Sequence, residues 1–248
     1  MFRLRIFQGK ELQSEKKKDY RNVVINQVII IVLGLTLSEF LVEGQQTTPA
    51  SKFVISIYTF FGAVYSFLLW DLLRDFTTSR ILINAVFFVL LGIVVVGILT
   101  EFPYYHVLHF EDRQSFLISL HSPVFLVEII IIGFAIRDIF SGEFLTPDKL
   151  WGSACIFLMI GISFGSLYHL ICIIRPGSLG DNLDIGFANY SECAAYSMSI
   201  LGGAEPGNPN AIKLIKNIST IEAVWSNLFV VLIIGKLMGL PRPPKSEA

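Results

Sequence analysis

The chain alternates between long apolar runs and short polar segments. A helix crosses a bilayer core of about 30 Å with roughly 20 residues, so runs of about 17 to 25 apolar residues indicate membrane-spanning helices. Six such runs, each bounded by charged residues, proline or glycine, occur at approximately 22–42, 53–73, 80–100, 117–139, 150–174 and 217–239. We therefore predict an all-α integral membrane protein with six transmembrane helices.

The composition supports this fold class. Of the 248 residues, 53% are hydrophobic and 16% are charged, whereas soluble domains carry about 25% charged residues. The net charge of −1 provides no basic surface for a nucleic acid, so the lipid bilayer is the expected partner. The basic segment before the first run is followed by no cleavage site of small residues, which predicts a retained first span rather than a signal peptide.

The distribution of lysine and arginine predicts the orientation of the chain. If the amino terminus is cytoplasmic, the inner segments are 1–21, 71–80, 137–149 and 236–248, and they hold fourteen of the nineteen Lys and Arg residues. Positive residues favour the cytoplasmic side, so both termini are predicted to be cytoplasmic. We expect a multi-pass protein of a bacterial inner membrane, with a eukaryotic plasma or organelle membrane as the open alternative.

The connection between the fifth and sixth runs, residues 175–216, has an unusual composition. Its middle part, 182–201, is moderately apolar but too short for a full span, and a stretch rich in Gly and Pro follows at 202–209. We interpret it as a half-crossing helix with an extended return. Non-helical backbone at membrane depth survives only where protein or a water-filled cavity covers it. An extracellular surface helix followed by a turn remains the alternative.

The predicted order is a helix, a half-crossing helix, a glycine-containing return with proline, and a last helix. This order resembles the pore domain of potassium channels of the voltage-gated-like superfamily. The last run is similar to the inner helix of small bacterial potassium-channel-like proteins, which carry Glu-Ala, then Gly-Gln-Leu-Tyr, an aliphatic run, a basic residue and Leu-Val-Gly. At these places the chain has Glu222-Ala223, Ser226-Asn227-Leu228-Phe229 and Lys236-Leu237-Met238-Gly239. The resemblance covers about residues 150–240, and it implies a re-entrant pore helix between the fifth and sixth transmembrane helices.

The resemblance also implies a selectivity filter, where the family carries Thr-Thr-Val-Gly-Tyr-Gly-Asp. The best alignment places seven residues there: Ser199, Ile200, Leu201, Gly202, Gly203, Ala204 and Glu205. Gly202 matches the first glycine, although a shift by one residue brings Gly203 to the same place. Filter glycines allow the backbone twist that turns carbonyl groups towards the ion. Because Ala204 replaces the second glycine, we expect altered selectivity or a closed pore, while a ring of Glu205 carboxylates favours cations.

The resemblance further implies a homotetramer, because one re-entrant loop cannot enclose an ion path alone. The chain then divides into a basic segment 1–21, a peripheral four-helix bundle 22–140, a pore domain 150–240 and a tail 241–248. Residues of the inner helix expected at the cavity and gate are Glu222, Asn227, Gly235 and Gly239. The predicted function is a pore-forming cation-channel subunit, with a non-conducting adaptor or sensor as the alternative. No cofactor is expected beyond a permeant monovalent cation.

Two features concern the fourth run. A voltage sensor needs several arginines in this helix, but the run 117–139 carries only Arg137, so voltage gating is not expected.

Glu128 lies near the middle of the same run, where an ionisable group requires a partner or a cavity. We expect either a carboxyl group hydrogen-bonded between helices, to Asn84 or a serine, or a stimulus-sensing or proton-linked site.

The remaining polar residues suggest no catalytic site. The four histidines lack the spacing of a metal site and are expected to be interfacial. Gly161 and Gly165 form a small-residue motif that predicts close packing between the outer and inner pore helices. No arrangement of Ser, His and Asp typical of a hydrolase is present, so we do not expect an enzyme.

Overall fold

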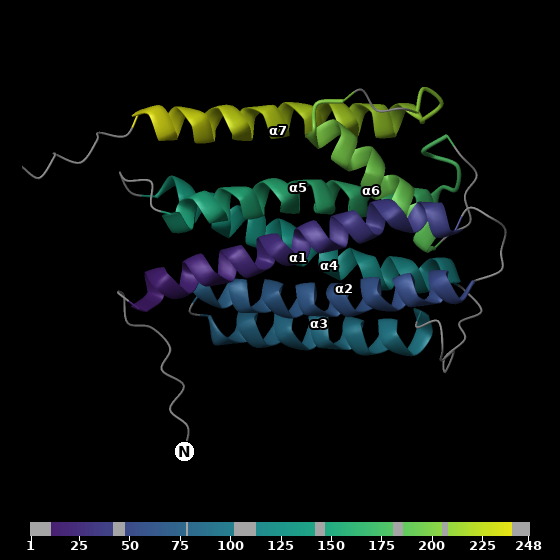
Figure 1. Ribbon diagram of the computed structural model, residues 1–248, viewed down its shortest axis with the longest axis horizontal. Coiled ribbons are helices and arrows are strands. Elements are labelled where there is room, and N and C mark those ends of the chain that lie inside the picture. The colour runs from purple at the N-terminus through teal and green to yellow at the C-terminus, as the bar shows by residue number, and fades with distance from the viewer. Residues whose placement is uncertain are drawn as a thin grey trace, which may run out of the picture.

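The computed structural model describes residues 11–41, 48–77, 79–101, 113–141, 147–180, 186–204 and 208–239. These residues form an elongated bundle of helices with the long helices side by side and one short helix set obliquely among them (Figure 1). The helices are α1 (Glu11–Leu41), α2 (Pro49–Phe76), α3 (Arg80–Glu101), α4 (Arg113–Phe140), α5 (Pro147–Ile174), α6 (Phe187–Leu201) and α7 (Lys213–Gly239).

Within the described residues, five helices are long and apolar enough to cross a membrane: α2, α3, α4, α5 and α7. Each contains one of the predicted runs, and the helix ends lie within a few residues of the predicted ends. The chain is thus an all-helical, multi-pass membrane protein. The prediction of six spanning helices is confirmed for these five, whereas α1, which contains most of the run 22–42, does not meet the same criterion.

Helix α1 differs from the others in its polar content. It begins with several charged residues, and its apolar part is interrupted by Asn26 and Gln27. Both side chains are buried. The Asn26 amide donates to the Phe61 carbonyl oxygen at 3.3 Å, and the Gln27 amide donates to the Cys155 carbonyl oxygen at 3.3 Å. These bonds join α1 to α2 and α5, and they explain how polar residues are accommodated in an apolar bundle.

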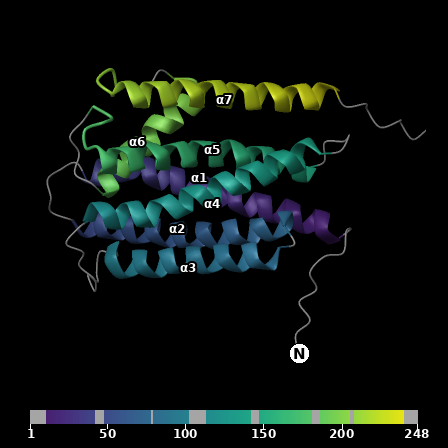
Figure 2. The same cartoon turned by 180° about the vertical axis from the view of Figure 1, so that it is seen from behind.

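Helix α5 lies at the centre of the bundle. It packs against α1, α4, α6 and α7, and Figure 2 shows it between α7 on one side and α4 and α2 on the other. Ile156 and Met159 of α5 share one apolar core with Leu69 of α2 and Ile131 of α4. The predicted peripheral bundle 22–140 therefore does not have a separate core, because α5 completes it.

Helix α2 has clear sequence signals at its start. Thr48 caps the helix, since its side-chain oxygen accepts a hydrogen bond from the Ser51 backbone N–H at 3.2 Å. Pro49 follows at the first helical position, where its missing N–H is not needed. Together these two residues fix the point at which α2 begins.

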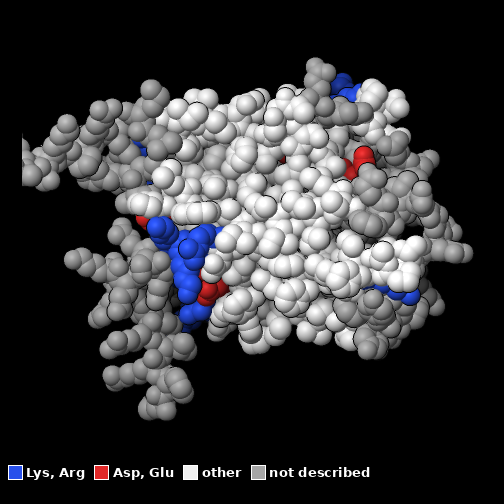
Figure 3. Space-filling model, viewed as in Figure 1, with Lys and Arg blue, Asp and Glu red and all other residues white. Residues whose placement is uncertain are grey.

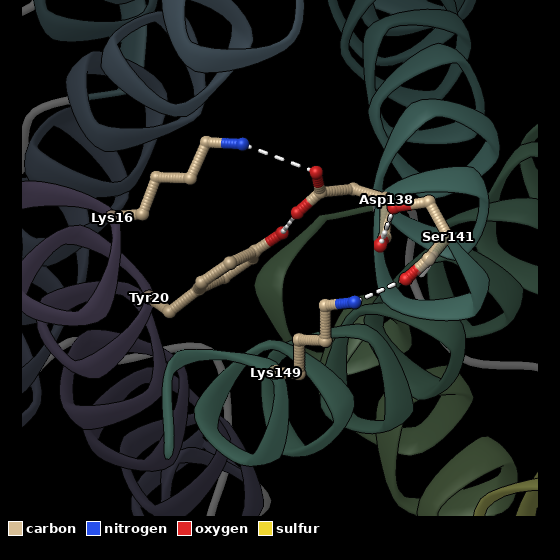
Figure 4. Close-up of polar contacts among 5 residues, drawn as sticks. All are labelled: Lys16, Tyr20, Asp138, Ser141 and Lys149. Atoms are coloured by element: carbon tan, nitrogen blue, oxygen red, sulfur yellow. Dashed lines mark hydrogen bonds and ion pairs between the residues drawn. The ribbon is translucent and has the colours of Figure 1, made fainter. Parts of the chain in front are cut away.

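Charged side chains gather near the ends of the helices, and the surface between them is largely uncharged in the view of Figure 3. One such group lies where α1 begins and α4 ends (Figure 4). The Lys16 ammonium pairs with Asp138 at 3.1 Å, and the Tyr20 hydroxyl donates to the other Asp138 oxygen at 3.4 Å. Burial, and then the nearby Asp138, raises the pKa of Tyr20, so its hydroxyl remains a donor. Lys149 donates to the Ser141 carbonyl oxygen.

The Asp138 contacts give a testable prediction about this end of the bundle. Both partners of the ion pair are partly buried, so we expect a double-mutant cycle of Lys16→Met and Asp138→Asn to give a coupling free energy of about 1 kcal/mol. Unfolding in mixed detergent micelles would measure it. Arg74 and Asp71 form a more exposed pair within α2 at 3.0 Å, and the same cycle there should give a smaller value. Equal coupling at the two pairs would contradict the prediction.

Candidate functional site

Helix α6 is the short oblique helix, and in both views it runs from α7 across α5 (Figures 1 and 2). Its 15 residues give a length of about 22 Å, which is less than the bilayer core of about 30 Å. It packs against α5, α1 and α7. The three helices α5, α6 and α7 form the candidate site.

A buried carboxyl group joins these three helices. Glu222 of α7 is 0% exposed. One of its oxygens accepts a hydrogen bond from the Tyr168 hydroxyl of α5 at 2.6 Å, and the other contacts the Ser197 hydroxyl of α6. Glu222 therefore points into the chain and holds α7 against its neighbours.

The hydrogen atoms of this network can be counted. The Ser197 oxygen lies 2.8 Å from the Gly161 carbonyl oxygen as well as against Glu222. A serine hydroxyl has one hydrogen to donate, and both of these neighbours are acceptors when the carboxyl group is ionised. All contacts are satisfied together when Glu222 is protonated and donates to Ser197. A neutral carboxylic acid also avoids placing an unpaired charge in an apolar environment.

The two glycines of the predicted small-residue motif lie where α6 crosses α5. A Cβ atom on Gly161 would lie 2.7 Å from Met198 Cε, and one on Gly165 would lie 3.2 Å from the Ala194 Cα. The prediction of close helix packing is therefore confirmed, but its partner is different. The motif packs against α6 and not against α7, the helix predicted as its partner.

The predicted filter segment is the end of α6 and its cap. Residues 199–201 are helical. The Gly203 N–H donates to the Ile200 carbonyl oxygen at 3.0 Å, and the Ala204 N–H donates to the Ser199 carbonyl oxygen at 2.9 Å. With Gly203 at φ 76°, this is a Schellman cap. The structure thus differs from the extended filter that we expected, and Glu205 lies outside the described residues.

The chain returns to α7 beside the end of α5. The Ile212 N–H donates to the Ser178 carbonyl oxygen at 2.9 Å. Ile215 then packs with Tyr168, Cys172 and Cys193 in a small core shared by α5, α6 and α7. The two thiols are 3.8 Å apart between their sulfur atoms. This core fixes the position of the first turns of α7.

Most of α7 beyond these turns is exposed. Asn227 is exposed in the middle of the helix, and its apolar neighbours Val224 and Val231 are 61% and 64% exposed. Nothing lies within 4 Å of a Cβ atom on Gly235, and Gly239 is the last helical residue. Of the predicted cavity and gate residues, Asn227 and Gly235 thus face outwards, whereas Glu222 does not.

Glu128 lies outside this group, in α4. It is 1% exposed, and its carboxyl group accepts a hydrogen bond from the Ser163 hydroxyl of α5 at 3.0 Å. The expectation of a carboxyl group bonded between helices is confirmed, with serine as the partner.

The contacts of Tyr168, Ser197 and His169 were not predicted from the sequence. Tyr168 and Ser197 are each one of several hydroxyl residues in their helices, and nothing in the sequence distinguishes them until a partner on another helix is known. His169 was expected at a membrane interface, and the structure shows that its side chain is buried among other helices, with 2% exposed. Its ring packs against those of His121 and Tyr190, with centroids 4.8 and 5.3 Å away.

The candidate site is thus a layer of three helices with a neutral hydrogen-bonded core and an outward face on α7. Among the described residues, no group of three or more His, Cys, Asp or Glu side chains is arranged to hold a metal ion. No family model, curated protein or solved structure matches the chain.

Proposed function

We propose that the chain is a pore-forming subunit of a potassium-channel-like cation channel that assembles as a homotetramer. In this proposal α5 is the outer helix, α6 the re-entrant pore helix and α7 the inner helix. The observation that carries it is the outward face of α7, where exposed Asn227 lies among exposed apolar residues in the middle of an apolar helix.

Asn227 needs a polar partner that the described part of the subunit does not supply. A polar side chain in the middle of a span is costly when it faces lipid, and such residues normally face a bundle interior or a water-filled cavity. Around a fourfold axis, Asn227 faces the water of a central path, and its neighbours Val224 and Val231 pack against adjacent subunits. The same face explains why α7 is less buried than α5.

The end of α6 supports a path for cations. The carboxyl end of a helix carries a partial negative charge, equivalent to roughly half an elementary charge. Four copies of α6 that end near one axis add these charges, and Glu205 follows three residues after Gly202 in the sequence. In this proposal a monovalent cation is the permeant ion.

A specific observation favours a second candidate function. The carbonyl groups of Ser199 and Ile200 accept hydrogen bonds in the cap of α6, whereas a filter needs rings of carbonyl groups that face the ion. A non-conducting adaptor or sensor with the same three helices requires no such ring. Both proposed functions involve a tetramer, but only the channel conducts ions.

The proposal also includes the position of α1 and of both termini relative to the membrane. We place α1 across the membrane as the sixth span, with both termini in the cytoplasm of a bacterial inner membrane. Support comes from Lys16 and Lys149, which contact Asp138 and Ser141 at the end of the bundle where α1 begins. Excess positive charge favours the cytoplasmic side.

Cation flux into liposomes tests the channel function. We expect purified protein to conduct potassium or sodium, and Asn227→Leu to reduce the flux because an apolar ring removes water from the path. Glu205→Gln should also reduce it, whereas Glu192→Gln on α6, ten residues before Gly202 in the sequence, serves as the matched control.

The mass of the protein in detergent separates the alternatives. A tetramer without flux would favour the adaptor or sensor. A monomer under conditions that preserve the fold would contradict both, and flux that ignores Asn227→Leu and Glu205→Gln would contradict the assignment of the path.

A further inference from the structure

A cavity of about 210 Å³ lies in the peripheral half of the molecule, away from the outward face of α7. Its walls come from α1, α2, α3, α4, α5 and the start of α6, and most of the lining side chains are apolar. An engineered apolar cavity of about 150 Å³ binds benzene. The cavity therefore has room for a molecule with one ring or a short alkyl chain.

Two glycines create part of this space. Gly62 of α2 and Gly97 of α3 both line the cavity. A Cβ atom on Gly62 would meet nothing within 4 Å, and one on Gly97 would only reach Leu120 Cδ2 at 4.0 Å. A methyl group at Gly62 would therefore extend into the cavity without meeting another atom.

Polar groups face the cavity from α4 and α5. They include Glu128, His121, Ser166 and His169. His169 is 2% exposed, and neither of its ring nitrogens has a hydrogen-bond partner in the part of the chain that the structure describes. A neutral imidazole has one donor and one acceptor, and leaving both buried and unpaired is unfavourable. A bound molecule with a polar group would pair with the ring nitrogen that faces the cavity.

We propose that this cavity binds an uncharged, mainly apolar molecule with a hydroxyl group, which enters from the lipid phase. A hydroxyl group can donate to an unprotonated ring nitrogen or accept from a protonated one, so it can pair with whichever His169 nitrogen faces the cavity. No lysine or arginine lines the cavity, so an anion has no partner. The single carboxyl group, Glu128, already accepts a hydrogen bond from Ser163, and the apolar walls disfavour an ammonium ion.

The cavity also touches α6. Tyr190 of α6 lines it, and its ring centroid is 5.3 Å from that of His169. The ligand thus contacts the peripheral helices and α6 together. This inference does not depend on ion conduction, and binding can be measured whether or not the tetramer conducts.

Photolabelling of the full-length protein in lipid vesicles tests the site. The probe is an octanol that carries an aliphatic diazirine, and labelled residues are located by mass spectrometry. We expect labelling of cavity residues on α2, α4 and α6, and competition by unlabelled octanol that is stronger than competition by octane or octylamine.

Variants assign the labelling to the cavity. Gly62→Leu should abolish it by filling the space, whereas Gly92→Leu is the matched control, because a Cβ atom there also meets nothing within 4 Å but Gly92 does not line the cavity. His169→Phe keeps the ring and removes the nitrogens, and should weaken competition by octanol by roughly tenfold.

Three outcomes would overturn the proposal. The first is labelling spread over lipid-facing residues that Gly62→Leu leaves unchanged. The second is equal competition by octane and octanol, which would show a pocket for lipid chains without a hydroxyl requirement. The third is stronger competition by octylamine, which would show a cation site at Glu128.

Discussion

Replacing Glu222 with alanine is expected to loosen α7 from the rest of the subunit. The substitution removes both contacts of the carboxyl group and leaves the Tyr168 and Ser197 hydroxyls buried without this partner. Each buried polar group that loses its partner costs about 1–3 kcal/mol. We expect the free energy of unfolding to fall by about 3 kcal/mol, measured by denaturant titration in mixed micelles.

Glutamine at the same position separates this explanation from a simple loss of volume. If Glu222 is protonated, Glu222→Gln keeps an acceptor for Tyr168 and a donor for Ser197, so stability should change by less than about 1 kcal/mol. Glu192→Ala on α6 is the control for removing a carboxyl group that is only partly buried. A Glu222→Gln variant as unstable as Glu222→Ala would show that the carboxyl group is ionised instead.

Gly165→Leu should also have a large effect. A Cβ atom at Gly165 already meets the Ala194 backbone at 3.2 Å, and backbone cannot move aside as a side chain can. Adding a leucine requires α6 to move away from α5, which we expect to cost about 3 kcal/mol. The free energy of unfolding and the oligomer mass should both report the change.

Two other glycine substitutions make this prediction specific. Gly161→Ala should cost less than Gly165→Leu, because its closest neighbours are the flexible ends of Met198 and Leu201. Gly92→Leu should have little effect, since that position is open. If Gly165→Leu is as stable as Gly92→Leu, the close crossing of α5 and α6 is incorrect.

The long helices could be predicted from the sequence because hydropathy alone determines them. The run 150–174 became α5 at Pro147–Ile174, and 80–100 became α3 at Arg80–Glu101. The first run was harder to interpret. Its polar residues Asn26 and Gln27 reduce its hydropathy, and their hydrogen bonds to α2 and α5 are visible only once the helices are assembled.

The spacing of Glu222 and Asn227 already indicates that they lie on different faces of α7, although we predicted both at the cavity. Residues five positions apart on an α-helix lie about 140° apart around its axis. A cavity-facing Asn227 therefore excludes Glu222 from the same face, and Glu222 lies in the interior as this geometry requires. The partners Tyr168 and Ser197 were not predictable, because they lie on two other helices.

The conformation at Gly202 and Gly203 could not be predicted from residue type. Glycine allows both the twisted extended backbone of a filter and the positive φ of a helix cap. The choice depends on which groups accept the hydrogen bonds of the following N–H groups, and here they are the Ser199 and Ile200 carbonyl oxygens. The cavity near His169 likewise results from the meeting of several helices and leaves no pattern in any one of them.

Helix α5 contributes both to the contact with α7 and to the wall of the peripheral cavity. Tyr168 bonds to Glu222 of α7, and the next residue, His169, lines the peripheral cavity. Adjacent residues on one helix are about 100° apart around its axis, so any rotation or tilt of α5 displaces both side chains together. A molecule that displaces His169 would therefore also displace Tyr168, the residue that bonds α7 to α5.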